Sequence, residues 1–376
     1  MFLALREIRF NKLRFGLMGA VIALIAVLMV LLSGLSVGLV KDGVSGLQNL
    51  PVTAFAFQQG VQHDAAFSRS VVDKSAVQDW LGQPGVEDAA PYGNALVNAK
   101  SDNGVEIDLA LFGVEPDSFL APAPAAGSAL GGANDIVVSQ TAIDAGLRIG
   151  DTLVVDRIGT ELQVVGSTGQ QDTFGHVDVA YVPLPTWQLI NGGIAPDDVA
   201  PEHVANEITA VAIQVADGET VDLAAADKAA GTETLSLEDS FGASPGYTAE
   251  TATLNLIQGF LYAISALVAG AFFAVWAIQR RHEVAVLRAM GASGGWVLRD
   301  ALTQALILLI ASVLVGVAVG VGLGALMTGG GVPFALNTAN VGLAALGLIA
   351  LGLIGAAVAV QRITRIDPVI ALGGNR

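Results

Sequence analysis

Three long runs without any charged residue or histidine constrain this chain more than any other feature of its sequence. They are Phe15–Val40, Thr251–Gln279 and Ala301–Gln361. Roughly 20 apolar residues cross the hydrocarbon core of a bilayer, so each run is long enough to span a membrane. As a single helix, the last run would be about three times as long as a bilayer is thick, so it must fold back. Three glycines and a proline within Thr328–Asn340 supply the break.

The pattern predicts a membrane α-helical fold with four transmembrane helices per chain and a mixed α/β extracytoplasmic domain inserted between helices 1 and 2. The predicted segments are a cytoplasmic amphipathic helix (1–15), transmembrane helices (16–40, 252–279, 301–327 and 340–361), the extracytoplasmic domain (41–250), a cytoplasmic coupling segment (280–300), an external loop (328–339) and a cytoplasmic tail (362–376).

Basic residues beside the uncharged runs orient them, because Lys and Arg near span ends mark the cytoplasmic side. These basic residues are Arg6, Arg9, Lys12, Arg14, Arg280, Arg281, Arg288, Arg299, Arg362, Arg365 and Arg376. We therefore expect a multi-pass protein of the plasma membrane with both termini in the cytoplasm. The first run is too long for a typical signal peptide, and no convincing cleavage site follows it, so we expect a retained helix.

The segment 41–250 is strongly acidic, with thirty Asp and Glu against seven Lys and Arg. That charge is typical of a soluble domain and argues against nucleic acid as a partner. Alternating apolar residues predict strands, and helices are expected within Val71–Gly85 and at Thr141–Leu147. The predicted strands are Ala95–Ala99, Ile107–Gly113, Ile136–Ser139, Thr152–Val155, Leu162–Gly166, Val179–Val182 and Ala210–Val215. The chain has no cysteine, so no disulfide holds this domain.

The chain lacks the patterns of a catalytic site. His63, His176 and His203 are dispersed without a metal-binding spacing, and no serine has a GxSxG context. No GxxxxGK[ST] phosphate-binding loop occurs either. Glycines at 316, 320 and 324, and at 34 and 38, are spaced by four residues, which predicts close helix packing. We therefore expect a non-catalytic membrane subunit without a cofactor of its own.

Several segments resemble the MacB/FtsX-type permeases of ABC transporters. They are MFLALREIRFNKLRF before the first span, VQDWLGQPGVEDAAPYGNALV and SQTAIDAGLRIGDTLVVDRIGTELQVVG in the outer domain, and QRRHEVAVLRAMGAS between the second and third spans. The stretch TLNLIQGFLYAISALVAGAFFAVWAIQ is similar to the HrtB-type haem-exporter permeases and their DevC-like relatives. The resemblance covers nearly the whole chain and is more specific for the superfamily than for the haem branch.

The resemblance implies a homodimer bound to two copies of a separate ABC ATPase subunit, which would bind the ATP and Mg. It also implies that the helix in 280–293 docks into a groove of that ATPase. Val284, Leu287 and Arg288 share one face at helical spacing, and Gly291 would end the helix. The predicted coupling residues are Arg280, Arg281, Glu283, Val284, Leu287, Arg288 and Gly291. The amphipathic N-terminal segment would lie against membrane lipids.

With haem as the implied substrate, polar residues at outer-leaflet depth become candidates for its site, because polar groups in spans tend to face interior sites. The candidates are Met29, Ser33, Tyr247, Glu250, Gln258 and Tyr262. Haem iron accepts thioether, phenolate and carboxylate ligands, so Met29, Tyr247 and Glu250 are candidate iron ligands, with Tyr262 as a further one. Ordinary packing of Met29 and interfacial anchoring of the tyrosines are the alternatives.

Two other functions remain open from the sequence. The permease could export another amphiphile, such as a lipid, peptide or drug. It could instead be an FtsX-like transmitter that moves no substrate and activates a cell-wall hydrolase through its outer domain. The spans carry no charged residue of the kind that ion-coupled transporters use, so the driving energy is expected from the ATPase partner.

Overall fold

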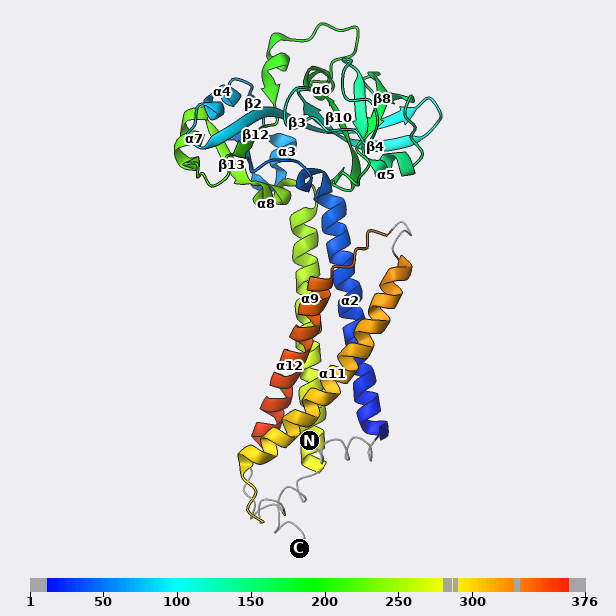
Figure 1. Ribbon diagram of the computed structural model, residues 1–376, viewed down its shortest axis with the longest axis vertical. Coiled ribbons are helices and arrows are strands. Elements are labelled where there is room, and N and C mark those ends of the chain that lie inside the picture. The colour runs from blue at the N-terminus through cyan, green and yellow to red at the C-terminus, as the bar shows by residue number, and fades with distance from the viewer. Residues whose placement is uncertain (1–11, 280–285, 287–289, 328–331, 365–376) are drawn as a thin grey trace. The chain divides into compact units, whose positions relative to one another are not determined.

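A computed structural model describes residues 12–279, 286, 290–327 and 332–364 (Figure 1). The chain divides into two compact units. The helical unit consists of Met1–Leu39 and Thr251–Arg376, and the outer unit is Val40–Glu250. The outer unit begins inside one long helix and ends inside the next, so it is an insertion into the helical unit.

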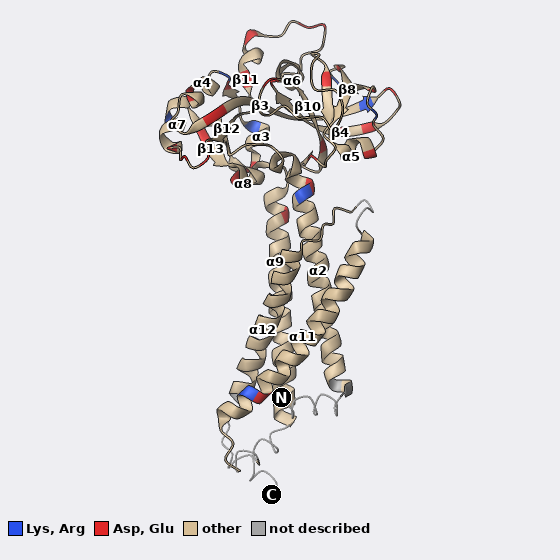
Figure 2. Cartoon of the chain, in the orientation of Figure 1, with Lys and Arg blue, Asp and Glu red and all other residues tan. Residues whose placement is uncertain are grey.

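Four helices are long and apolar enough to cross a membrane. They are α2 (Lys12–Gln48), α9 (Tyr247–Gln279), α11 (Gly294–Met327) and α12 (Thr338–Thr364). Figure 2 shows that Lys, Arg, Asp and Glu are sparse along these helices and frequent on the outer domain. The four predicted spans and the domain inserted between the first two are thus confirmed.

The helices continue beyond the uncharged runs from which the spans were predicted. The helix α2 passes through Lys41 and Asp42 to Gln48, and α11 begins five residues before Arg299. A charge ends a stretch that fits into lipid, but it does not end a helix, because Lys, Arg and Asp are all compatible with helical geometry. The helix α2 ends shortly before Pro51, which disfavours helical conformation in the residue before it.

The glycine ladder of α11 is confirmed as a packing surface within the helical unit. A Cβ atom at Gly316 would overlap the backbone oxygen of Ala23 in α2, and one at Gly320 would lie 2.8 Å from the Cβ of Val30. Such spacing is closer than real Cβ contacts allow. The absence of side chains therefore lets α2 and α11 approach to backbone contact.

Gly34 and Gly38 of α2 were predicted to pack against another helix, but they allow a close approach by a non-helical segment instead. They face the segment that precedes α12, where a Cβ atom at Gly34 would overlap the ring of Phe334 and one at Gly38 the carbonyl of Pro333. The backbone N–H of Ala335 donates to the carbonyl of Gly34 at 3.0 Å, which fixes this segment on α2. The described part of the break inside the longest uncharged run, Pro333–Ala335, is therefore packed against the first helix.

The outer domain is a mixed α/β fold. Its strands are β1 (Ala54–Gln58), β2 (Val72–Asp73), β3 (Val86–Ser101), β4 (Glu106–Val114), β5 (Ala126–Gly127), β6 (Asp135–Val138), β7 (Thr152–Val155), β8 (Glu161–Ser167), β9 (Thr173–Phe174), β10 (Val177–Pro183), β11 (Glu207–Ile208), β12 (Ala210–Val215) and β13 (Thr232–Ser236). Its helices are α3 (Ala66–Arg69), α4 (Ala76–Leu81), α5 (Gln140–Asp144), α6 (Leu184–Asn191), α7 (Leu223–Ala230) and α8 (Leu237–Ser240), with 3-10 turns at His63–Ala65, Glu202–Asn206 and Phe241–Ala243.

Most of these strands form one sheet in the order β13-β1-β12-β3-β4-β10-β6-β8-β5. The long strand β3 joins its two halves, because its first part pairs with β12 and its second part with β4. The pairs β4–β10 and β6–β8 are parallel, and the other pairs are antiparallel. Strands β2 and β11 form a separate pair.

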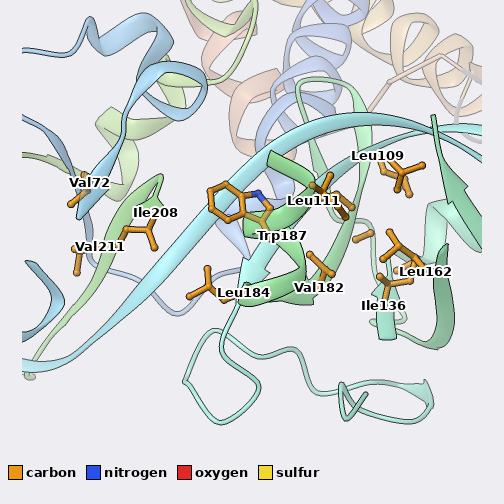
Figure 3. Packing of buried hydrophobic residues seen from close by; sticks show 14 of the residues in the cluster. Val72, Leu109, Leu111, Ile136, Leu162, Val182, Leu184, Trp187, Ile208 and Val211 are labelled. Atoms are coloured by element: carbon orange, nitrogen blue, oxygen red, sulfur yellow. The ribbon is translucent and has the colours of Figure 1, made fainter. Parts of the chain in front are cut away.

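Alternation along the strands gives the sheet two buried faces. In β4, Leu109 and Leu111 face one core while Ala110 and Phe112 face the other. The first core includes Trp187 of α6, and Figure 3 shows it among Leu111, Val182 and Leu184. The second core is rich in aromatic rings and takes in Val44 and Leu47 from the last turns of α2. The end of α2 is thus part of the folded outer domain.

Trp187 packs directly on the backbone of the sheet. Cβ atoms added at Gly93 of β3 or Gly113 of β4 would overlap its indole ring. The two glycines pair with each other across these strands, so they form a flat seat for the ring. This explains why two glycines are tolerated inside otherwise regular strands.

The seven strands predicted from the sequence are all present. The short helix expected within Val71–Gly85 is confirmed as α4, Ala76–Leu81, and strand β2 at Val72–Asp73 precedes it. The carboxylate of Asp73 accepts the backbone N–H of Ser75 at 2.8 Å, and this turn separates the two elements. Strands β1 and β13 and helices α6 and α7 were not predicted.

Candidate functional site

The two predicted site residues in α2 are packed inside the helical unit. Met29 is 2% exposed and belongs to the core that α2 forms with α9, α11 and α12, and Ser33 is 7% exposed. A haem that reached Met29 would therefore have to displace packed side chains of this core. In this structure Met29 is a packing residue of the helical core, which is the alternative that the sequence left open.

The predicted polar face of α9 lies on the buried side of that helix. Leu254 and Ser265 on this face are buried, and Gln258 and Tyr262 are half-buried. Tyr262 contacts α12, since a Cβ atom at Gly347 would lie 2.9 Å from its ring. The hydroxyl of Ser265 is fully buried and makes no hydrogen bond within the described residues. This face thus packs inside the same chain.

Tyr247 and Glu250 lie in the first turn of α9, inside the outer unit. The ring of Tyr247 packs edge-on against Phe241 with centroids 6.2 Å apart. The carboxylate of Glu250 contacts His176 Nε2 at 3.1 Å. The sequence made these two residues candidates for the haem site, but it gave no hint that Glu250 would pair with a histidine.

His176 bridges two carboxylates. Its Nδ1 lies 2.9 Å from Oδ2 of Asp42 in α2, while its Nε2 faces Glu250 in α9. Burial lowers the pKa of His176, but its hydrogen bond to Asp42 and the negative charges of Glu250 and Asp42 outweigh this effect, so the pKa lies above its ordinary value. Ionised carboxylates only accept, so a ring that bonds to both must donate from both nitrogens and carry a positive charge.

The sequence places His176 in this position through a tight turn. Gly175 and His176 connect β9 to β10, and Phe174 pairs with Val177 across the turn. Both turn residues have positive φ, 58° at Gly175 and 66° at His176. This is the geometry of a type I′ hairpin turn. Gly-His between two apolar strand residues was the sequence signal that could have identified the turn, although not its partners.

The hairpin is also fixed on α2 by hydrogen bonds that its backbone N–H groups donate. The N–H of Gly175 donates to the carbonyl of Gly43 at 2.8 Å, and the N–H of Thr173 donates to Ser45 Oγ at 3.0 Å. The hydroxyl of Ser244 donates to the same Gly43 carbonyl at 3.0 Å. His176 is therefore held at a defined place against the helix, and its ring does not depend on the ion pairs alone for its position.

Among the described residues, no three His, Asp or Glu side chains are arranged to hold a metal ion. At His176 the two carboxylates lie on opposite ring nitrogens, which is the arrangement of a cation between two anions. The outer-domain pair His63–Glu233, at 2.7 Å, involves one histidine and a single carboxylate.

The predicted coupling residues Arg280, Arg281, Glu283, Val284, Leu287 and Arg288 lie outside the described residues. Gly291 is described and has a φ of 101°, a conformation that favours glycine. After it, Ser293 caps the start of α11, where its Oγ accepts the backbone N–H of Trp296 at 3.2 Å. The chain thus turns at Gly291 before the third long helix begins.

Two protein families match this chain. The MacB-like periplasmic core domain matches residues 16–230, and the C-terminal domain of FtsX-like permeases matches residues 255–368. Together they cover most of the outer domain and the greater part of each of the four long helices, and the first alone covers more than half of the chain.

Curated relatives match over the full length. A protein of Staphylococcus epidermidis strain ATCC 12228, named hemin transport system permease protein HrtB, is 24% identical over 100% of this chain and 99% of its own. A protein of the same name from Staphylococcus haemolyticus is 23% identical over 99% of both chains.

Solved structures similar to the chain cover about half of it. One is the extracellular domain of the noncanonic ABC-type transporter YknZ from Gram-positive bacteria, with 12% identity over 49% of this chain and 98% of that one and a TM-score of 0.34. Another is the periplasmic region of MacB from Actinobacillus actinomycetemcomitans, with 14% identity over 52% and 94% and a TM-score of 0.36.

The family matches extend over the inserted α/β domain and over the helices on both sides of it, in the order that the structure shows. The chain therefore belongs to the MacB/FtsX family of ABC-transporter permeases.

Proposed function

We propose that this chain is the permease subunit of an ABC-type efflux pump that exports haem from the membrane, driven by a separate ATPase subunit. The observation that carries the proposal is the full-length similarity to relatives named hemin transport permeases. Similarity confined to the helices would support only the family, because the helices are shared by permeases with different cargoes.

The proposed assembly is a homodimer with two copies of the ATPase, which bind the ATP and Mg. Both termini and the segment 280–300 face the cytoplasm, as the excess of Lys and Arg in these regions favours. ATP binding would close the ATPase dimer and move the coupling segments, and the helices would transmit that movement to the outer leaflet. The outer domain lies on the opposite side of the membrane.

The proposed haem contacts within the helical unit come from α2 and α9, with Ser33, Gln258 and Tyr262 as polar groups and Met29 as a candidate ligand, while Tyr247 is a separate candidate within the outer unit. Glu250 is engaged by His176 in this structure, so Met29 and Tyr247 are the iron ligands that we would test first. Because Met29 is buried in the core of the helical unit, haem binding there requires the helices to separate.

Haem binding and its effect on ATP hydrolysis test the proposal. The purified permease–ATPase complex in nanodiscs should show a haem Soret band and faster ATP hydrolysis as haem is added. Met29→Leu should shift the Soret band and weaken haem binding about tenfold or more, as expected when a metal loses a ligand.

Met18→Leu is the matched control, because Met18 is equally buried in α2 and belongs to the same core. It should leave the spectrum and the affinity unchanged. Unchanged haem binding in both variants would remove Met29 from the site, and a complex without a Soret band and without haem-stimulated hydrolysis would contradict haem export itself.

Two alternatives give different results in the same complex. If another amphiphile is exported, a lipid, peptide or drug will stimulate ATP hydrolysis while haem will not. If the chain is an FtsX-like transmitter, a cell-wall hydrolase will bind the outer domain. The match of residues 255–368 to FtsX-like permeases is the observation that keeps this second alternative in view.

A further inference from the structure

The chain passes between its two units at two helical crossings, and one histidine contacts both. The outer unit starts at Val40 in α2 and ends at Glu250 in α9. Asp42 lies in the first turn after the first crossing, and Glu250 is the last residue before the second. His176 holds both carboxylates, at 2.9 Å and 3.1 Å.

We propose that His176 is a positioning residue that ties the two helical crossings together, so that α2 and α9 transmit motion to the outer domain as one body. This role is independent of the cargo. It requires a cation at the tip of the β9–β10 hairpin and one carboxylate from each helix, and all three groups lie within the outer unit.

The backbone at residue 176 supports a dedicated role for the side chain. His176 has a φ of 66°, a left-handed conformation that strains a residue with a Cβ atom and that glycine adopts without this strain. The chain nevertheless carries a histidine there. Its side chain is 30% exposed, and those of Asp42 and Glu250 are 26% and 38% exposed, so the contacts are partly shielded from water.

The charges around His176 explain what its loss would do. The charged groups that act on its ring are Asp42 from α2 and Glu250 from α9. Gln171, from the segment before β9, also donates to Asp42 at 3.4 Å, but it carries no charge. Without His176, two like charges would remain beside each other at the crossings and would repel.

Substitutions at residue 176 distinguish the loss of the two ion pairs from a disruption of the β9–β10 turn. His176→Gly keeps, and even relaxes, the left-handed turn while it removes the cation, so it should not unfold the hairpin. His176→Arg keeps a cation within reach of both carboxylates. The matched control is His63→Gln, which removes a histidine–carboxylate pair elsewhere on the same domain.

The movement of one unit against the other can be measured directly, because the chain has no native cysteine. Spin labels at Leu96→Cys in β3 and Leu314→Cys in α11 place one reporter in each unit, and both residues are exposed. The full permease–ATPase complex would be examined by double electron–electron resonance spectroscopy. Labelled chains would be diluted with unlabelled ones so that distances within one chain dominate.

The expected result is a broader distance distribution in His176→Gly than in the unsubstituted chain, recovery of the narrow distribution in His176→Arg, and no change in His63→Gln. A distribution in His176→Gly as narrow as in the unsubstituted chain would overturn the proposal. Equal broadening in His176→Gly and His176→Arg would also overturn it, because it would show that the charge is irrelevant.

Discussion

Gly316 has no room for a methyl group, and this makes the packing of α2 against α11 testable at a single residue. We expect Gly316→Ala to lower the free energy of unfolding of the helical unit by about 1–3 kcal/mol, the usual cost of overpacking. The reason is the overlap of the added Cβ with the backbone of Ala23 and the side chain of Ala26. Steric trapping in bicelles measures this free energy.

Gly322 is the control for that substitution. It lies in the same helix, two residues from Gly320, but an added Cβ would meet nothing within 4 Å. Gly322→Ala should change the free energy of unfolding by no more than about 0.5 kcal/mol. If both alanine variants unfold alike, the close contact at Gly316 does not hold α2 and α11 together.

Glu233 predicts a small acid sensitivity of the outer domain. A hydrogen bond from the backbone N–H of Gly60 and a second one from His63 lower the pKa of this carboxyl group. Because the pKa is lower in the folded state, the stabilisation is present above the unfolded value of about 4.3 and is lost as pH falls through the folded value. Since Glu233 is partly exposed, the effect on stability is modest.

Thermal unfolding of the outer domain in the full chain, followed between about pH 6 and pH 3, measures this effect. Glu233→Gln should lower the melting temperature at the upper end of the range and approach the unsubstituted chain at the lower end. A pH-independent difference for Glu233→Gln would contradict the ionic origin of the effect.

At the level of elements, the last turns of α2 belong to the outer domain and carry one polar face. Asp42 and Ser45 in α2 and Asn49 directly after its end are spaced by three and four residues. Each of them contacts the segment 171–176. Asn49 donates to the buried carboxylate of Asp172 at 2.6 Å. The hairpin and the helix therefore form one bonded surface, on which His176 occupies one end.

Removing the hydroxyl of Ser45 should loosen this surface. Ser45 is 2% exposed, lies 2.8 Å from Thr173 Oγ1 and accepts the N–H of Thr173. Ser45→Ala would leave that buried N–H without its partner, at a cost of about 1–3 kcal/mol. Hydrogen exchange of peptides that cover the hairpin should become faster. Gln48→Ala, on the exposed side of α2, should not change it.

How far the sequence predicted these elements depended on how their residues are patterned. The spans were evident because lipid excludes charge over long runs, and strands such as β8 were evident because exposed and buried residues alternate along them. The strand β1 escaped prediction because Ala54–Phe57 is buried on both faces and shows no alternation. The helix α7 is short and rich in alanine, so its only buried residue is Ala226 and it shows no apolar stripe.

The candidate site was harder to predict for a different reason. The polar face of α9 could be read from helical spacing, but its direction toward α12 depends on Gly347, which is far away in the sequence. The link at His176 joins residues separated by 134 and 74 positions. No local pattern encodes such a contact, so a dispersed histidine was the only sign of it.

For the whole molecule, we expect the ATPase to be held through the basic segment between α9 and α11. Replacing Arg280, Arg281 and Arg288 with Glu should abolish copurification of the ATPase, because the predicted docking helix would then carry the opposite charge. The control replaces Arg148, Arg157 and Lys228 of the outer domain with Glu, which changes the net charge equally. Loss of the ATPase in both variants, or in neither, would contradict docking through this segment.

The shared contact of Asp42 and Glu250 with one histidine means that the outer domain begins and ends at neighbouring points. A domain with adjoining ends can be exchanged by recombination as a cassette, because any replacement needs only to match two helix ends. The order of the four helices, and the segment that we propose to face the ATPase, would be inherited unchanged. Such an exchange would give the protein a new outer surface and leave the helices as they are. Residue 176 contacts the chain beside both points where the replacement domain would join the helices.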